Sequence, residues 1–193
     1  GLDKLTAKRE APGVEVDWQD LYATQKDVFV NQLKLATELN KPVVCHCVGS
    51  FGDMMEIFQA QRKLPPMIYM HAFGGSVDYA KCLQKLPDTE LYFGFASAIN
   101  LKAKKTREVL RSIPPERILL ESDLEQPHRL DECIDTMLEV MAETIDWDGV
   151  YAHDGDDDSG KSSSRDAVIS LTSRNAARFY DRSLLGTDTN TGA

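Results

Sequence analysis

The sequence predicts an α/β fold of parallel strands that forms about half of a (β/α)8 barrel. Short apolar runs at residues 43–45, 67–70, 91–95 and 118–120 are separated by segments of helical length. Strands that alternate with helices along a chain usually pair in parallel. These βα units occupy roughly 100 residues, whereas a complete barrel needs roughly 250. An open doubly wound sheet is the alternative, but no glycine-rich phosphate loop of the GxGxxG or Walker type follows any of the strands.

Composition indicates one globular domain with an acidic surface. The chain has 193 residues, enough for one core, and a formal net charge of −9. This charge argues against nonspecific adhesion to nucleic acid through a basic surface. It does not exclude a phosphodiester substrate, because bound divalent cations supply positive charge. No apolar run approaches the roughly 18–20 residues of a membrane span, and no signal peptide is visible, so no membrane partner is expected.

The N-terminal part is expected to hold a loop and then a long helix. Residues 3–15 are polar, contain Pro12-Gly13, and predict a loop. Apolar residues recur with a period of 3.6 from residue 18 to residue 40, and Asp17 is placed to cap this helix. Lys41-Pro42 ends the helix, because the residue before proline is pushed out of the α region. The β-branched run that follows predicts the first strand.

The remaining helices are predicted from apolar periodicity and from proline or glycine boundaries. They are expected at residues 51–62, 76–86, 102–111, 129–145 and 166–180, with a loop at 96–98. Residues 153–165 are acidic and rich in serine and glycine, which predicts a mobile insertion; a calcium loop at 154–158 is disfavoured by its misplaced glycine. The domain is expected to span residues 1–182, with a polar tail at 183–193.

Three residues of metal-ligand type follow three of the predicted strands. His46, His71 and Asp123 each stand at or just beyond the carboxyl end of an apolar run. Parallel βα units bring such strand ends to one mouth of the fold, and imidazole and carboxylate groups bind Zn, Mn and similar ions. A lone histidine at such a place is more often a structural residue, and Asp123 alone would serve as a helix cap. Their equivalent positions favour a site, where the three side chains are expected to lie close together.

The four cysteines indicate a reducing compartment rather than a disulfide framework. They lie in predicted strands or helices at positions 45, 47, 82 and 133. We therefore expect a cytoplasmic protein, with the nucleus as a second location. Cys45 and Cys47 flank His46 and on a strand would point to the opposite face, so we interpret both as core thiols rather than zinc ligands. Serine-hydrolase chemistry is not favoured, because the GxSxG turn is missing.

Five segments together resemble the TatD-related metal-dependent deoxyribonucleases. Their residues are most similar to those of a divergent eukaryotic branch of this family. They are Gly1-Leu2-Asp3, the glutamine-rich helix that leads to Pro42 and His46, His71-Ala72-Phe73-Gly74-Gly75, Glu121-Ser122-Asp123, and Asn175-Ala176-Ala177-Arg178-Phe179. The similarity runs from residue 1 to about residue 182. The family's His-x-His motif and a bridging glutamate would lie before Gly1, Val48 stands where a basic residue is common, and the usual Asp-x-Pro is changed after Asp123.

The resemblance implies a TIM-barrel metal-dependent hydrolase fold, represented here by its C-terminal half. It implies one or two divalent ions (Mg, Mn or Zn) held by His46, His71 and Asp123, with Asp123 also catalytic. The expected reaction is hydrolysis of DNA phosphodiester bonds by a metal-activated water. DNA or a nucleotide phosphodiester is the expected substrate, and a protein partner or a separate N-terminal half of the barrel is a further expected partner. The alternatives are a degenerate barrel that acts as a protein-interaction module, and an amidohydrolase acting on a small amide.

Overall fold

The computed structural model describes residues 1–10, 17–102, 104–145 and 164–181. Within these ranges a parallel sheet is built from β2 (Val43–Cys45), β4 (Met67–Met70), β5 (Glu90–Phe95) and β6 (Ile118–Leu120), in that order across the sheet. Each strand pairs in parallel with the next one along the chain. A shorter parallel pair joins β1 (Leu2–Asp3) to β3 (Cys47–Val48). The fold is a partial (β/α)8 barrel, as the sequence predicts.

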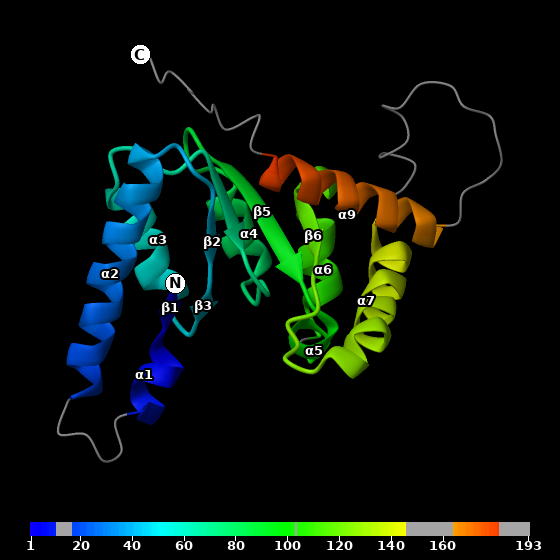
Figure 1. Ribbon diagram of the computed structural model, residues 1–193, viewed down its shortest axis with the longest axis horizontal. Helices are drawn as coiled ribbons and strands as arrows, with labels where there is room; N and C mark the ends of the chain where they lie inside the picture. The colour runs from blue at the N-terminus through cyan, green and yellow to red at the C-terminus, as the bar shows by residue number, and fades with distance from the viewer. Residues whose placement is uncertain (11–16, 103, 146–163, 182–193) are drawn as a thin grey trace, which may run out of the picture.

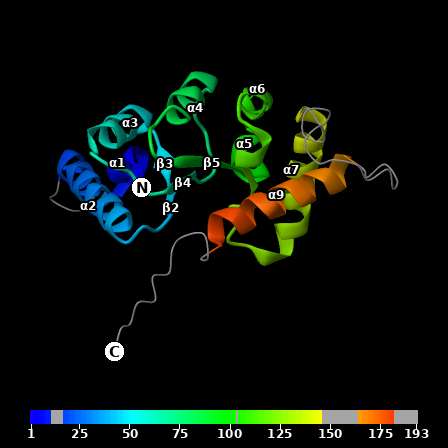
Figure 2. The ribbon, with the colours of Figure 1, turned by 90° about the horizontal axis from the view of Figure 1, so that it is seen from above.

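Helices connect consecutive strands and cover one face of the sheet (Figure 2). In chain order the α-helices are α1 (Lys4–Glu10), α2 (Trp18–Glu38), α3 (Phe51–Ala60), α4 (Val77–Leu83), α5 (Ser97–Asn100), α6 (Thr106–Arg111), α7 (Leu130–Thr144) and α9 (Ser164–Tyr180). Short 3₁₀ turns at Pro115–Arg117 and Pro127–Arg129 flank β6. None of the described helices is long and apolar enough to cross a bilayer.

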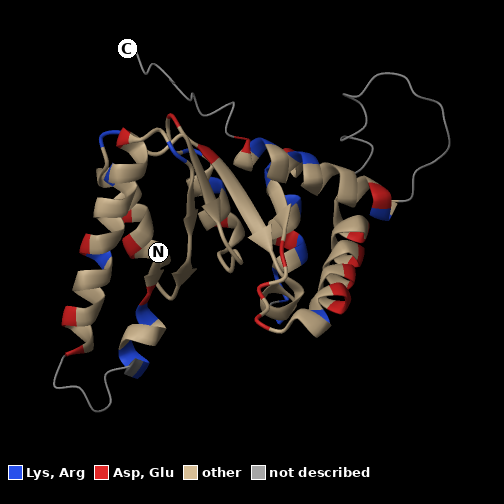
Figure 3. Cartoon of the chain, viewed as in Figure 1, with Lys and Arg blue, Asp and Glu red and all other residues tan. Residues whose placement is uncertain are grey.

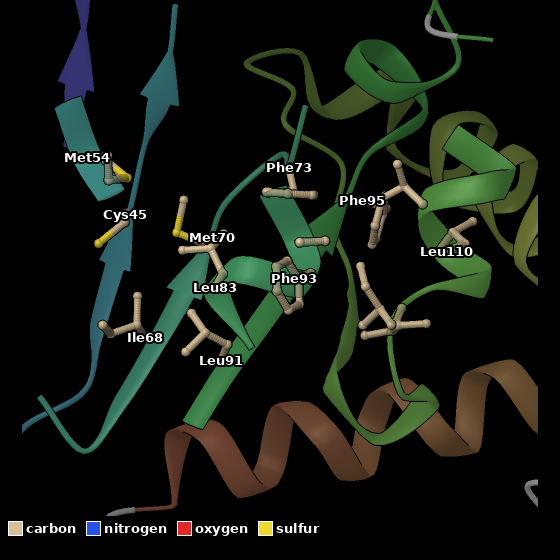
Figure 4. Packing of buried hydrophobic residues seen from close by; sticks show 14 of the residues in the cluster. Cys45, Met54, Ile68, Met70, Phe73, Leu83, Leu91, Phe93, Phe95 and Leu110 are labelled. Carbon is tan, nitrogen blue, oxygen red and sulfur yellow. The ribbon is translucent and has the colours of Figure 1, made fainter. Parts of the chain in front are cut away.

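Side chains of the strands alternate between two apolar clusters, because successive residues of a strand point to opposite faces. On the face toward the connecting helices, Ile68 and Met70 of β4 and Leu91 and Phe93 of β5 lie in the main core (Figure 4). On the other face a smaller cluster gathers around Phe179 of α9. Its buried members are Met67, Tyr69, Tyr92, Leu119 and Phe179. This second face belongs to the barrel interior, and His46, His71 and Glu121 continue it beyond the strands.

The long helix α9 closes the amino ends of β5 and β6 (Figure 1). Asn175 is buried and donates its side-chain amide to the carbonyl oxygens of Pro115 and Ile118, at 2.9 and 2.8 Å. The Phe179 ring meets the rings of Tyr69 and Tyr92 edge-on, with centroids 5.6 and 5.4 Å apart. This packing fills the interior below the strands and leaves the opposite, carboxyl ends open for a site.

The predicted elements agree with the structure in kind, and the differences lie mainly at their ends and in two loops. Asp17 caps α2 by accepting a hydrogen bond from the backbone N–H of Gln19 at 3.0 Å, and Ser76 caps α4 in the same way. The predicted loop at residues 3–15 is wrong in its described part, because Asp3 ends β1 and also accepts from Thr6 in the first turn of α1.

The segment after β5 also differs from the sequence prediction. The predicted loop at residues 96–98 begins helix α5 instead, and the predicted helix at 102–111 is shorter, beginning at Thr106. The buried side chain of Asn100 explains this change: it accepts from the Ala96 N–H and donates to the Phe73 carbonyl, both at 2.8 Å. Of the predicted mobile insertion at 153–165, residues 164 and 165 belong to α9, and the rest, like the predicted tail, lies outside the described residues.

Candidate metal-dependent hydrolase site

The three predicted site residues meet at the carboxyl ends of the strands. His71 follows β4 directly, and its backbone N–H donates to the carbonyl of Cys45 on β2 at 3.0 Å. The Nε2 atom of His71 lies 2.9 Å from Oδ1 of Asp123, which comes three residues after β6. The rings of His46 and His71 are 6.2 Å apart between centroids. The predicted clustering is therefore confirmed, whereas the catalytic and metal-binding roles of these residues stay predictions.

Glu121 holds His71 from the other side of the imidazole ring. Its Oε2 atom lies 2.6 Å from Nδ1 of His71 and also accepts a short hydrogen bond from the Tyr69 hydroxyl. Its Oε1 atom accepts from the backbone N–H of Ala72. Because a carboxylate only accepts hydrogen bonds, Nδ1 of His71 is the donor in this pair. The contact fixes the orientation of the ring and directs Nε2 toward the mouth of the site.

Gly94 makes room for this hydrogen-bonded group. A Cβ atom at position 94 would lie 2.6 Å from Oε1 of Glu121 and closer still to the Tyr69 hydroxyl oxygen. Such distances are shorter than real Cβ atoms show, so a side chain here would displace Tyr69 or Glu121. This glycine near the carboxyl end of β5 is thus required by the close approach of Tyr69 on β4 and Glu121 directly after β6.

His46 has a second carboxylate beside it. Its Nε2 atom lies 3.4 Å from Oδ2 of Asp3, and the His46 side chain is 49% exposed. Asp3 is held in place by Thr6, whose backbone N–H and hydroxyl donate to its two carboxylate oxygens at 2.8 and 2.7 Å. The β1–β3 pair positions both groups, because the N–H of Leu2 donates to the His46 carbonyl at 2.8 Å.

Two backbone positions in the site adopt the left-handed region, which is uncommon for residues other than glycine. Ala72 has φ of 42° and Asp123 has φ of 51°. Aspartate tolerates this region better than most residues, whereas alanine pays a steric cost. Such outliers gather at functional sites, where surrounding contacts hold them. Here the Ala72 conformation directs its N–H to Glu121, and the Asp123 conformation accompanies the contact of its carboxylate with His71.

The surroundings of the site raise the pKa of both His71 and Tyr69, so that each holds its proton more tightly. The pKa of His71 is raised by its hydrogen bond to Glu121 and by the charges of Glu121 and Asp123, which outweigh burial. Burial raises the pKa of Tyr69, and the neighbouring Glu121 carboxylate raises it further. For Asp3, burial alone would raise the pKa, but hydrogen bonds from Thr6 and contact with His46 outweigh it, so its pKa is lowered.

The side chains present fit part of a divalent metal site. Imidazole nitrogens and carboxylate oxygens of the required types face one another in the pairs His46–Asp3 and His71–Asp123. However, the described residues contain no group of three or more His, Cys, Asp or Glu side chains that could hold an ion by itself. The donor chemistry therefore fits a metal, and further ligands would have to complete its coordination.

Sequence reasoning missed Asp3, Tyr69 and Glu121 as members of the site. Tyr69 and Glu121 could have been found from the sequence, because residues i and i+2 of a strand share a face. Tyr69 precedes His71 by two positions, and Glu121 precedes Asp123 by two. The contact of Asp3 depends on the β1–β3 pairing, which residues 2–3 are too few to indicate. Cys45 is buried in the core and Cys47 packs against it, as predicted.

A partial barrel with histidines and carboxylates gathered at the carboxyl ends of its parallel strands is the arrangement of a barrel hydrolase. Sequence comparison agrees with this class and narrows it. The TatD related DNase family matches residues 1–181, and the chain belongs to this family.

Individual relatives show the same kinship. The chain is 39% identical over 103 residues to the human 3′-5′ RNA nuclease TATDN2, covering 51% of this chain and 13% of that protein. It is 34% identical over 135 residues to the deoxyribonuclease Tat-D of Schizosaccharomyces pombe, covering 63% and 42% of the two chains. The crystal structure of YJJV, a TatD homologue of Escherichia coli, matches with a TM-score of 0.63 at 19% identity, over 92% of this chain and 68% of that one.

Each match covers a larger share of this chain than of the relative. The chain spans about half, or less, of the length of the curated relatives that it matches. The structural likeness to YJJV establishes the barrel fold. Activity, substrate and metal identity do not follow from it.

Proposed function

We propose that this chain forms part of a metal-dependent nuclease that hydrolyses phosphodiester bonds at the site of His46, His71 and Asp123. The observation that carries the proposal is the convergence of these three side chains at one end of the sheet, with His71 Nε2 2.9 Å from Asp123 Oδ1. Nuclease relatives on the same family fold support it. DNA is the proposed substrate, because the predicted motifs resemble deoxyribonucleases, and RNA is the competing one, because TATDN2 is named an RNA nuclease.

Each residue has a role that its position allows. His46 and His71 would hold one or two divalent ions through Nε2, with Asp123 as a carboxylate ligand; His71 would first give up the Nε2 proton that faces Asp123 in the structure. Asp123 would also orient the attacking water and accept its proton. Glu121 keeps the Nδ1 proton of His71 in place, so that Nε2 faces the mouth. A bound divalent ion supplies positive charge for the phosphate and lowers the pKa of water. Mg, Mn and Zn all remain candidates.

The test is a nuclease assay with substitution of the catalytic carboxylate. Labelled single-stranded DNA, labelled RNA and a small amide would each be incubated with the protein and Mg, Mn or Zn. The protein would be tested alone and together with an N-terminal segment of the Schizosaccharomyces pombe relative, which would supply further strands. We expect metal-dependent cleavage of nucleic acid that Asp123→Asn lowers by at least 100-fold, as for loss of a group that acts in the transition state.

Asp131→Asn is the matched control, because Asp131 is an exposed aspartate on α7. It should leave the rate unchanged. Cleavage of the amide alone, or nucleic-acid cleavage that is insensitive to Asp123→Asn, would refute the proposal. Nothing in the described residues favours the interaction module or the amidohydrolase over the nuclease. Cytoplasm or nucleus is kept as the proposed location, on the placement of the cysteines in strands and helices.

A further inference from the structure

The first helix begins at the candidate site and carries a basic surface that the catalytic chemistry does not use. Asp3, whose carboxylate faces His46, also caps α1 through Thr6. Lys4, Lys8 and Arg9 follow on this helix, whose first turn has no acidic residue. In a chain of net charge −9 this contrasts with α7, which carries only acidic charged side chains (Figure 3). The positive charge of α1 therefore lies next to the site.

Aromatic side chains of α2 lie directly against these lysines. The ammonium group of Lys8 is 4.7 Å from the centre of the Trp18 ring, and that of Lys4 is 5.4 Å from the Tyr22 ring. Tyr22 is buried and its hydroxyl donates to Asp53, so it serves as a support. Trp18 is only partly buried. A partly exposed indole ring beside lysines is a combination that suits single-stranded nucleic acid, because it offers a stacking platform next to cations.

From this arrangement we propose that α1 and the start of α2 form a docking surface for single-stranded nucleic acid, with Lys4 and Lys8 on the phosphates and one base stacked on Trp18. The inference rests on the proposed nuclease function and adds where the strand lies. Lys4 and Lys8 are one helical turn apart, about 6 Å along the axis, so they contact successive positions of a strand that leaves the site along α1. A base on Trp18 takes the place that the Lys8 ammonium group holds in the structure and releases this lysine toward a phosphate.

A single strand fits this surface better than a duplex. Stacking on an aromatic side chain needs a base whose face is free, and the bases of a duplex are already stacked on one another. The contacts proposed here are made to phosphates and to the face of one base, so binding should depend little on sequence. It should depend strongly on salt, because the lysines displace counterions from the phosphates.

The test uses tryptophan fluorescence, which reports binding without hydrolysis. The sequence contains two tryptophans, Trp18 and Trp147; Trp147→Phe therefore leaves Trp18 as the only one. This variant is titrated with oligothymidylate, oligouridylate and a DNA duplex in the presence of EDTA, at low and high salt. We expect both single strands to quench Trp18 fluorescence, the duplex to bind at least fivefold more weakly, and high salt to weaken binding.

Substitutions then distinguish binding at the docking surface from a nonspecific effect of positive charge. Binding of a labelled oligothymidylate, followed by anisotropy, should weaken at least fivefold in Lys4→Ala/Lys8→Ala and in Trp18→Leu, and Lys4→Arg/Lys8→Arg should retain it. Lys34→Ala/Lys81→Ala is the matched control, because both lysines are exposed and lie on α2 and α4; it should change the affinity less than twofold. Circular dichroism verifies that each variant is folded.

Two outcomes overturn the docking surface: an oligonucleotide that does not quench Trp18, or an affinity that falls equally in the α1 variant and in the control. These outcomes are distinct from failure of the proposed function. A chain that binds through α1 but never cleaves would leave the docking surface standing and refute the nuclease. A chain that cleaves nucleic acid but binds it equally well with the α1 substitutions would support the nuclease and refute the docking surface.

Discussion

At the scale of single residues, the site depends on contacts between side chains that neighbouring strands present on one face. Tyr69, His71 and Glu121 form one hydrogen-bonded group, and Gly94 provides the space for it. Buried polar groups of this kind are stabilising when every member has a partner and costly when one is displaced. The glycine is therefore as much part of the site as the groups that would touch a substrate.

We predict that Gly94→Ala destabilises the protein by about 1–3 kcal/mol, the usual cost of inserting an atom into a filled space. The new methyl group would displace the Tyr69 hydroxyl or the Glu121 carboxylate and free His71 to rotate. Urea unfolding measures the first effect, and the chemical shifts of the His71 ring measure the second. Gly52→Ala is the control, since a Cβ atom there meets nothing within 4 Å and α3 should gain stability. Equal stability of Gly94→Ala and the parent chain would contradict the geometry.

A second residue-scale prediction concerns acid. Burial by itself raises the pKa of Glu90, but hydrogen bonds and charges of Arg117 and Arg178 outweigh it, so the pKa is lowered from its usual value. A carboxyl group with a lowered pKa in the folded state stabilises the protein above its unfolded pKa of about 4.3. This contribution is lost as the pH falls through the folded pKa.

The stability advantage of the parent over Glu90→Gln should therefore shrink as urea unfolding is repeated from neutral pH down to below pH ~4. The Glu90 side chain is 38% exposed, so solvent screening keeps the effect modest. Glu116→Gln, at an exposed position, is the control and should show no comparable trend. An advantage that grows as the solution becomes more acidic would mean that the sign assigned here is wrong.

At the scale of elements, α9 acts as a clamp on the amino ends of the sheet. Asn175 satisfies two backbone carbonyls, of Pro115 and Ile118, that lie in two different elements. Phe179 packs under Tyr69 and Tyr92, two positions on the inner face. Through these contacts the clamp holds the start of β6, the strand that leads to Glu121 at the opposite end of the sheet.

We predict that Asn175→Ala destabilises the protein by about 1–3 kcal/mol, because the buried Ile118 carbonyl loses its side-chain donor, whereas the Pro115 carbonyl keeps the backbone N–H of Ile118. Hydrogen exchange of the β6 amides should accelerate with it. Ser173→Ala, an exposed change two residues away on the same helix, should stay within about 0.5 kcal/mol of the parent. Retention of full stability and of β6 protection in Asn175→Ala would show that α9 is not a clamp.

Sequence patterns predicted the long elements and the site histidines, and their limits have physical causes. The strands at Val43, Met67 and Ile118 stand out because apolar β-branched or large residues lie between turn residues. Helix α5 was missed because its four residues are too few to show a helical period. Helix α1 was missed because its residues are mostly polar and because Asp3, which accepts hydrogen bonds from Thr6 in its first turn, is placed by the pairing of β1 with the distant β3. The role of Gly94 depends on two neighbouring strands and has no local signal.

At the scale of the whole molecule, the sheet ends on one side at β2, and the barrel interior beside it is open. Val44 of β2 is 52% exposed, and Leu39, directly after α2, is 58% exposed. A cleft of about 380 Å³ lies between α2 and β2. Exposed strand edges and apolar surfaces of this kind favour association. In the four-stranded sheet that the structure describes, β2 and β6 are the two edge strands.

We predict that the 193-residue chain associates with itself through the β2 edge. Sedimentation velocity should show a sedimentation coefficient that rises with concentration. Val44→Lys should shift the chain toward monomer, because a lysine at an exposed edge opposes strand pairing, whereas Ile169→Lys, an exposed apolar position on α9, should not. A parent chain that stays monomeric at every concentration would rule out association through this edge.

The most direct test of the account is to locate a bound divalent ion. Mn²⁺ broadens nuclear magnetic resonance signals of nearby groups, so a titration shows where the ion binds even when some ligands are missing. We predict that the ring signals of His46 and His71 broaden first, that Asp123→Asn weakens this effect, and that the side-chain amide of Asn175, at the amino ends of the strands, stays sharp. Broadening that is strongest along the acidic helix α7, or equal at Asn175 and His71, would contradict a metal site at the carboxyl ends of the strands.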